Sequence, residues 1–180
     1  MLRGINVGGK NIIKMAELKR VFEAIGLYKI QTYIQSGNVL FKSVEDEESL
    51  RNKIEHELEV VFGFPITVIL RTAVEFESII LNCPFSQVEI TLAKSCSGVE
   101  SLYVSLLANV PLNEKVRYLN CYKSDHDDFK IVGRDVFLLF GNSIRNSKLA
   151  NNLQKLDVPA TVRNWKTITK LSSLAKAMEI

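Results

Sequence analysis

The feature that most limits the fold of this 180-residue chain is an order of strand and helix patterns that occurs twice. Alternating apolar residues predict strands, and apolar residues three and four positions apart predict helices with one buried face. The first half gives the order strand, helix, strand, strand, helix, strand. We assign these elements to residues 2–7, 15–25, 30–34, 39–41, 50–62 and 66–70.

The second half repeats the order of elements, although the residues themselves do not repeat. Its predicted elements are 101–108, 111–122, the hairpin 128–140, 144–156 and 160–164, and a last helix follows. Two β-α-β-β-α-β units in tandem predict an α+β fold of two ferredoxin-like subdomains. We expect an N-terminal subdomain at 1–84 with an added helix, a connector at 85–100 and a C-terminal subdomain at 101–180.

The composition is that of a globular chain, with 47% hydrophobic and 24% charged residues. No run approaches the roughly 18 apolar residues that cross a bilayer, so we expect no membrane partner. The N-terminus has no basic and then apolar signal peptide, and we expect a cytoplasmic location. Residues 141–180 carry seven basic and two acidic side chains, an excess that attracts anions to this end of the chain.

The cysteines and histidines predict neither a disulfide framework nor a metal site. Cys83, Cys96 and Cys121 are odd in number and have no short pair spacing, so we expect free thiols. His56 and His126 form no His-x-x-x-His pair. We therefore expect no metal and no other cofactor.

The N-terminal stretch GINVGGK has the spacing of a phosphate-binding P-loop. A working P-loop needs a helix that opens at the lysine, and a Ser or Thr hydroxyl beside it for magnesium. Here Asn11 follows Lys10, and the helical pattern starts only at about Met15. We reject nucleotide hydrolysis. Two hypotheses stay open, a flexible glycine turn with solvated lysines and an anion-binding nest of main-chain N–H groups.

Three motifs in the order LRGINVGGKNIIKMAELK, YIQSGNVLF and TVRNWKTITKL resemble the bacterial domain of unknown function 1697 family (DUF1697). The resemblance covers nearly the whole chain. It implies a bacterial, cytoplasmic protein with two ferredoxin-like subdomains and no assigned biochemical activity. Similar proteins carry several residues before the first motif, so either the first strand is shortened here or the start of the chain is incompletely represented.

The family's characteristic positions fall on polar residues and glycines at the ends of predicted elements. In this sequence they are Arg3, Gly4, Asn6, Gly8, Gly9, Ser36, Gly37, Asn38, Ser147, Lys148, Leu149, Arg163, Asn164, Trp165, Thr167 and Lys170. Asn164 directly precedes the last helix, and a phosphate there could use the helix N-terminus together with Arg163 and Lys170. The alternative is that Asn164 only caps the helix and that the lysines are solvated.

Other candidate sites have weaker support. Ser147 and Lys148 resemble a nucleophile pair, but adjacent helical side chains diverge by about 100°, so an anion contact by Lys148 is favoured over catalysis. The acidic stretch SDHDD lacks the glycine and distal glutamate of a calcium loop, and we expect a solvated turn. The strand 37–43 lacks the aromatic pattern of RNA-binding sheets.

Together these features predict a protein that binds an anionic, phosphate-bearing ligand such as a nucleotide or a nucleic acid at one shared site. The candidate ligand-binding residues are Arg3, Asn6, Gly8, Gly9, Lys10, Ser36, Asn38, Ser147, Lys148, Arg163, Asn164 and Lys170. No catalytic residue is assigned. Two alternatives stay open, an enzyme that acts on a small phosphorylated or carboxylate substrate, and a protein–protein interaction module that forms a homodimer.

Overall fold

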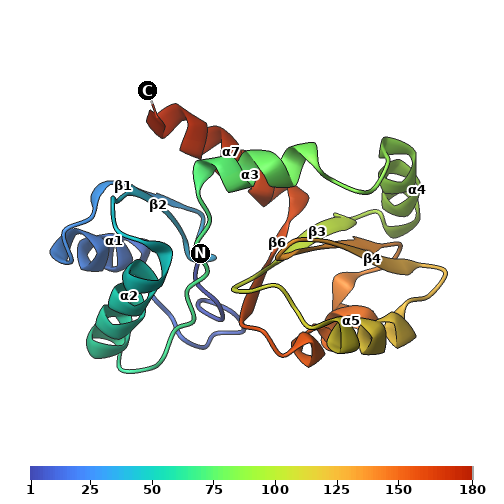
Figure 1. Cartoon of the computed structure of the whole chain (residues 1–180), viewed down its shortest axis with the longest axis horizontal. Helices are drawn as coiled ribbons and strands as arrows, with labels where there is room; N and C mark the ends of the chain where they lie inside the picture. Colours follow the sequence, from blue (N-terminus) through green and yellow to red (C-terminus); the bar gives the residue numbers. More distant parts are fainter. Residues whose placement is uncertain (180) are drawn as a thin grey trace. The chain divides into compact units, whose positions relative to one another are not determined.

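The computed structural model describes residues 1–179, apart from the side chains of residues 96, 97 and 179. Over these residues the chain has an α+β fold with seven α-helices and two antiparallel sheets (Figure 1). It divides into two compact units, Met1–Thr72 with Ser173–Ile180, and Ala73–Ser172. The subdomain ranges 1–84 and 101–180 stay a prediction.

The first unit contains two helices and a hairpin, as its apolar periodicity predicts. The elements are α1 (Met15–Ala24), β1 (Tyr28–Tyr33), β2 (Asn38–Lys42) and α2 (Glu47–Phe62). β1 and β2 pair antiparallel as a two-stranded sheet. The buried faces of the two helices share one hydrophobic core, to which Leu18, Phe22, Ile54 and Leu58 belong.

The strands predicted at residues 2–7 and 66–70 do not form. The two segments share one isolated bridge, between Leu2 and Val68, and Val7 forms a second one with Lys10. The other contacts are single backbone bonds such as Leu2 N to Gly37 O at 2.8 Å. Both strand predictions are wrong. The first unit therefore has a sheet of only two strands, and the predicted tandem of two ferredoxin-like subdomains is not confirmed.

Left-handed backbone in the N-terminal loop explains why the first strand is missing. Gly4 and Asn6 have φ of 72° and 55°, which interrupts the extended conformation of a strand. Val7 and Lys10 then close a tight turn, in which Lys10 N donates to Val7 O at 3.1 Å. The helix begins only at Met15, as predicted, so the loop has no helix start at its lysine.

The second unit contains a four-stranded sheet with helices on both faces. Its elements are α3 (Ala73–Leu81), α4 (Gln87–Ser97), β3 (Leu102–Leu107), α5 (Asn113–Leu119), η1 (Asn120–Tyr122), β4 (Asp127–Val132), β5 (Asp135–Phe140), η2 (Ile144–Asn146), α6 (Lys148–Asn151), η3 (Leu153–Leu156), β6 (Ala160–Asn164) and α7 (Trp165–Glu179). The last residues of α7 belong to the first unit. The strand order is β4-β5-β3-β6, and every neighbouring pair is antiparallel.

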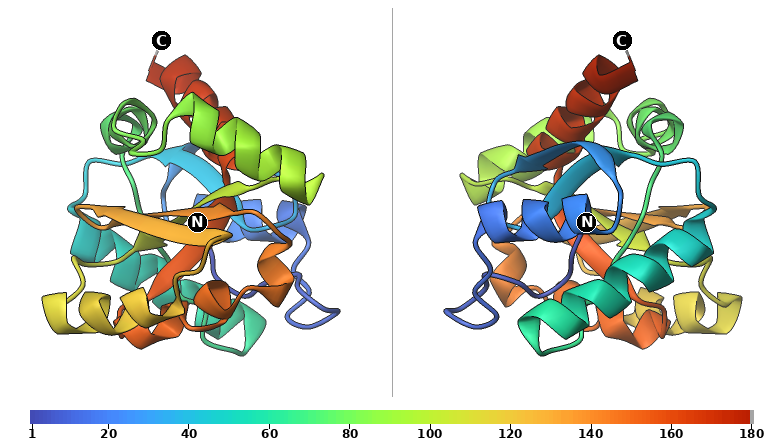
Figure 2. Two further views of the ribbon diagram at one scale, coloured as in Figure 1. Left: turned by 90° about the vertical axis from the view of Figure 1, so that its right-hand side faces the viewer. Right: turned by 90° about the vertical axis from the view of Figure 1, so that its left-hand side faces the viewer.

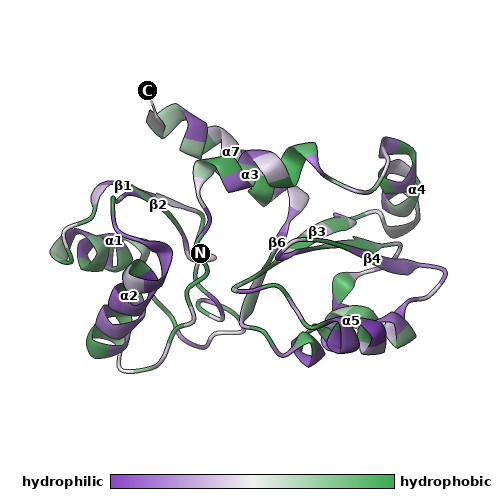
Figure 3. Cartoon of the chain, in the orientation of Figure 1, coloured by the Kyte–Doolittle hydropathy of each residue, from purple (hydrophilic) through white to green (hydrophobic). Residues whose placement is uncertain are grey.

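Alternation along the strands gives this sheet two apolar faces. On one face Leu107, Leu138 and Phe140 share a core with Leu119 of α5. On the other face Phe137 contacts the ring of Trp165, with centroids 6.4 Å apart. In Figure 1, α5 lies on one side of the sheet, and α3 and α4 lie on the other. Figure 3 shows α2 and α5 with alternating hydrophilic and hydrophobic colours, as expected for helices with one buried face.

The connector expected at 85–100 stays a prediction, and the segment contains the helix α4. This helix starts with a capping box: Ser86 Oγ accepts from Glu89 N, and the Glu89 carboxylate accepts from Ser86 N. One prediction in the second unit needs correction. The single helix expected at 144–156 is broken into η2, α6 and η3. Asn152 ends α6 by donating from its side chain to Lys148 O at 2.8 Å, because asparagine competes for helical backbone bonds.

The structure describes no metal cluster and no membrane span. Among the described residues, no three His, Cys, Asp or Glu side chains gather as metal ligands, and Asp128 pairs with Lys123 at 2.6 Å. None of the described helices is long and apolar enough to cross a bilayer. Cys83 and Cys121 are free thiols, and the side chain of Cys96 lies outside the described residues.

Gly37 is the glycine whose replacement the first unit tolerates least. Its φ is +76°, and an added Cβ would lie 2.8 Å from Leu2 Cβ and 2.9 Å from Ile5 Cδ1. Strain and overpacking together lead us to expect that Gly37→Ala lowers the free energy of unfolding by about 2–4 kcal/mol, measured by urea denaturation. Gly26→Ala is the control, since its φ is +84° but nothing lies within 4 Å. Equal losses in the two variants would contradict the packing argument.

Ile34 is a strained residue in the turn of the β1–β2 hairpin. Its φ is +48°, a conformation that β-branched side chains adopt only at a cost, and its side chain is half exposed. We expect Ile34→Asn to raise the free energy of unfolding by about 1 kcal/mol, because asparagine tolerates this conformation. Thermal and urea unfolding measure the change. A loss of stability would show that Ile34 packs more than its exposure indicates.

Candidate functional site

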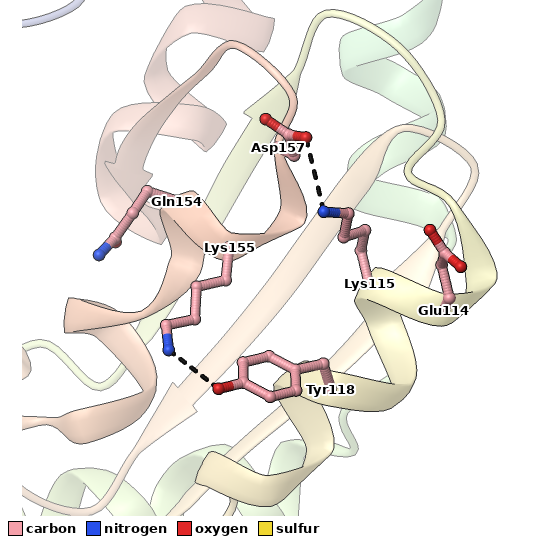
Figure 4. A pocket seen from close by; sticks show the side chains of 6 residues that line it. All are labelled: Glu114, Lys115, Tyr118, Gln154, Lys155 and Asp157. Carbon is pink, nitrogen blue, oxygen red and sulfur yellow. Dashed lines mark hydrogen bonds and ion pairs between the residues drawn. The ribbon is translucent and has the colours of Figure 1, made fainter.

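A groove of about 610 Å³ lies between α5 and the turn η3 in the second unit (Figure 4). Its volume is within the range of roughly 300–1,000 Å³ that is usual for small-molecule sites. The lining side chains come from α5, from η3 and from the residue after η3. They are Glu114, Lys115, Tyr118, Gln154, Lys155 and Asp157.

Apolar packing holds the two walls of the groove in place. Leu119 of α5 and Leu156 of η3 are fully buried in the same core, on one face of the sheet. Tyr118 precedes the first of these leucines and Lys155 precedes the second. Tyr118 and Lys155, the chain neighbours of these two buried leucines, therefore meet across the groove.

Lys155 and two tyrosines form the most closely bonded polar cluster of the groove. Lys155 Nζ donates to Tyr122 Oη at 2.8 Å and to Tyr118 Oη at 3.1 Å (Figure 4 draws the second bond). The ammonium also lies 4.7 Å from the ring centroid of Tyr118 and 5.2 Å from that of Tyr122. The two rings meet edge to face, with centroids 5.8 Å apart.

The contacts within this cluster shift the ionisation of its members. Hydrogen bonds with Tyr122 and then Lys155 lower the pKa of Tyr118, because they stabilise the phenolate oxygen. Hydrogen bonds to the two phenol oxygens raise the pKa of Lys155. Lys155 therefore keeps its positive charge at neutral pH.

The rest of the groove mixes both signs of charge. Lys115 Nζ lies 3.6 Å from Asp157 Oδ2, with the carboxylate largely exposed (Figure 4). Glu114 and Gln154 are exposed side chains that add a second carboxylate and an amide. The groove thus offers two ammonium groups, two carboxylates and a phenol to a ligand that carries charged and polar groups.

The predicted site residues of the first unit divide into exposed residues and structural ones. Asn6 is structural: its Oδ1 accepts from Ile13 N at 2.8 Å, and its Nδ2 donates to Ile13 O at 2.9 Å and to Gln35 O at 2.8 Å. Asn38 is buried and donates to Tyr33 O and Ser36 Oγ. The exposed members are Arg3, Gly8, Gly9 and Lys10.

The predicted site residues of the second unit divide in the same way. Ser147 caps α6, since its Oγ accepts from Ala150 N at 3.1 Å. Asn164 caps α7 through Thr167 N at 2.9 Å, which confirms the expected cap. Lys148 and Lys170 are exposed.

Arg163 lies mostly inside the second unit. Its Nη1 donates to Thr161 Oγ1 at 2.7 Å and to Val162 O at 2.8 Å. Burial lowers the pKa of Arg163 to about 10. The guanidinium has structural partners, and its role in binding a ligand stays a prediction.

The groove and the predicted residues do not coincide. None of the twelve candidates lines the groove, and they are divided between the two units, so a shared site stays a prediction. Tyr118 and Tyr122 are four positions apart, a spacing that places both rings on one side of a helical turn. That pair is the sequence signal that could have indicated this surface. Lys155 has no local signal.

The cluster predicts a specific change in tyrosine ionisation. Replacing Lys155 with Met removes a hydrogen bond and a positive charge from the Tyr118 oxygen, so Tyr118 should ionise at a higher pH than in the native protein. Tyr122→Phe should act in the same direction, while Lys148→Met should leave the midpoint unchanged. A pH titration followed by NMR of labelled tyrosine rings measures the midpoint. An unchanged midpoint in Lys155→Met would contradict the cluster.

Comparison with known proteins gives the family of the chain and a solved structure that resembles it. The family described as a protein of unknown function (DUF1697) matches residues 1–137. A conserved bacterial protein from Streptococcus pneumoniae is similar in structure, with 26% identity over 97% of this chain and 96% of that chain, and a TM-score of 0.72. No curated protein matches. The chain belongs to the DUF1697 family.

Proposed function

We propose that this protein binds a small anionic ligand with a phosphate group in the groove between α5 and η3. The observation that carries the proposal is the Lys155–Tyr118–Tyr122 cluster, in which the Lys155 ammonium and the Tyr118 hydroxyl meet in an open groove and Tyr122 bonds to both. Such donors pair with anionic oxygens, and bonds that involve a charged group are the stronger ones.

The hydrogen-bonding inventory of the cluster supports an external acceptor. The Lys155 ammonium has three N–H groups, and two of them bond to phenol oxygens. The Tyr122 hydroxyl donates to Tyr118 Oη at 3.4 Å. Within the described residues, one N–H of Lys155 and the hydroxyl proton of Tyr118 have no acceptor from the protein. A phosphate oxygen at the groove wall can accept from both.

The carboxylates of the groove favour a nucleotide over a bare phosphate ion. Glu114 and Asp157 repel an anion that fills the whole groove, but they accept hydrogen bonds from sugar hydroxyls or from base amino groups. A ligand with a phosphate at one end and neutral donors at the other can bind to both the ammonium groups and the carboxylates of the groove. The Lys115 ammonium lies 3.6 Å from Asp157 Oδ2, and it can leave this ion pair to bind the ligand.

The exposed basic residues outside the groove are the second set of candidates for the same ligand class, considered separately in each unit. Lys148 and Lys170 lie in the same unit as the groove, and Arg3 and Lys10 lie in the first unit. They add positive potential, which attracts phosphates over a distance of about 10 Å at ordinary salt. The experiment below separates these residues from the groove.

We extend the proposal to the fold of the second unit and to location. The succession β3, α5, β4, β5, α6, β6 with the strand order β4-β5-β3-β6 supports a ferredoxin-like second unit. The free thiols of Cys83 and Cys121 support a reducing compartment, and so a cytoplasmic location. A homodimer stays a prediction.

Titration calorimetry of the full chain with inorganic phosphate and with ADP tests the groove. We expect ADP to bind more tightly than phosphate, and Lys155→Met to weaken ADP binding about tenfold or more, as expected for a charged hydrogen bond. Tyr118→Phe should weaken it by a smaller factor.

Lys148→Met is the matched control, because Lys148 is an exposed lysine of the same unit that does not line the groove. Its affinity for ADP should stay within about twofold of the native protein. Binding that is lost in Lys148→Met and kept in Lys155→Met would overturn the groove as the site. Absence of binding by both probes would overturn the proposed function.

A further inference from the structure

The first unit exposes three aliphatic side chains beside one hydrogen-bonded group. Val7, Ile12 and Ile34, here named the apolar tip, are 67%, 72% and 50% exposed. Val7, Ile12 and Ile34 directly precede or follow Asn6, Ile13 and Gln35 in the chain. Hydrogen bonds of the Asn6 side chain to Ile13 and to Gln35 O join these three neighbours into one group. The tip therefore joins the N-terminal loop and the hairpin turn.

The loop that carries the tip stands clear of its surroundings. A Cβ added at Gly8 or at Gly9 would meet no atom within 4 Å, and both glycines are exposed. Figure 2 shows the dark-blue N-terminal loop extending away from α1. Val7 and Ile12 are thus held outward on a segment that has little packing of its own.

Only positive charge surrounds the tip along the chain. Residues 1–16 and 27–44 contain Arg3, Lys10, Lys14, Lys29 and Lys42 and no Asp or Glu. Four of these five cations are exposed, and Lys42 is half-buried. Arg3, Lys10 and Lys14 belong to the N-terminal segment that carries Val7 and Ile12, whereas Lys29 and Lys42 lie at the end of the hairpin far from Ile34.

We propose that the apolar tip inserts into the interfacial layer of an anionic lipid bilayer, while Arg3, Lys10 and Lys14 contact the lipid headgroups. Aliphatic side chains gain free energy when they leave water for the acyl boundary, and each nearby cation is attracted by the negative surface potential. The contact lies on the membrane and needs no spanning segment, so it departs from the expectation of no membrane partner, which rested on the lack of a spanning run. It is independent of the groove.

A bilayer fits these observations better than a nucleic acid or a protein. Single-stranded nucleic acids stack on aromatic rings, whereas the tip is aliphatic. A protein partner of ordinary size covers about 800 Å² of each surface, more than three side chains on a protruding loop offer. A bilayer needs no complementary shape, and its charge complements the cations.

Vesicle co-sedimentation of the full chain tests the proposal. Vesicles of phosphatidylglycerol and phosphatidylcholine are compared with vesicles of phosphatidylcholine alone, at low and high salt. We expect binding only to the anionic vesicles, with affinity that falls as salt rises. The triple variant Val7→Ser, Ile12→Ser, Ile34→Asn should lower the partition coefficient about tenfold or more. It should stay folded, because all three side chains are exposed.

The matched control is Val60→Ser with Val61→Ser, two valines on α2 that are 65% and 51% exposed beside acidic residues. This variant should bind anionic vesicles like the native protein. Equal loss in the control, or unchanged binding by the triple variant, would overturn the proposal. So would competition by soluble glycerophosphate at millimolar concentration, or a preference for an oligonucleotide that the triple variant retains. The Lys155→Met variant should bind vesicles like the native protein, so the vesicle experiment tests the membrane contact independently of ligand binding in the groove.

Discussion

The antiparallel pairing of β3 with both β5 and β6 is the interaction on which the second unit depends. β3 is buried on both faces, so the sheet needs a helical layer on each side. One layer includes α5 and η3, whose leucines pack under the sheet and fix the walls of the groove. Apolar packing, more than any contact between the polar groups themselves, therefore determines where the ammonium and the phenols meet.

Periodicity in the sequence predicts those elements whose apolar faces are continuous. The two helices of the first unit, both hairpins, β6 and α7 all follow from it. It fails where single residues override the pattern. Left-handed backbone at Gly4 and Asn6 removes the first strand, and Asn152 breaks the helix expected at 144–156. The capping box at Ser86 could have indicated α4, but the weak apolar pattern of that segment concealed it.

Local sequence patterns are limited in the same way as predictors of the candidate site. Motif residues such as Asn6, Asn38, Ser147 and Asn164 have side chains that bond to nearby backbone, so their positions in the motifs are explained by loop and cap geometry. The groove depends instead on Lys155 and Tyr118, which are 37 positions apart. A contact over that distance arises from tertiary packing, and no local pattern in the sequence encodes it.

The three hydrogen bonds of Asn6 have a consequence for any contact made by the N-terminal loop. They fix a glycine-containing segment that would otherwise sample many conformations, and they do so before a partner arrives. The conformational entropy of the loop is thus lost during folding and not during association. A surface prepared in this way can form and release its contact rapidly, since no reordering of the chain separates the free state from the bound one.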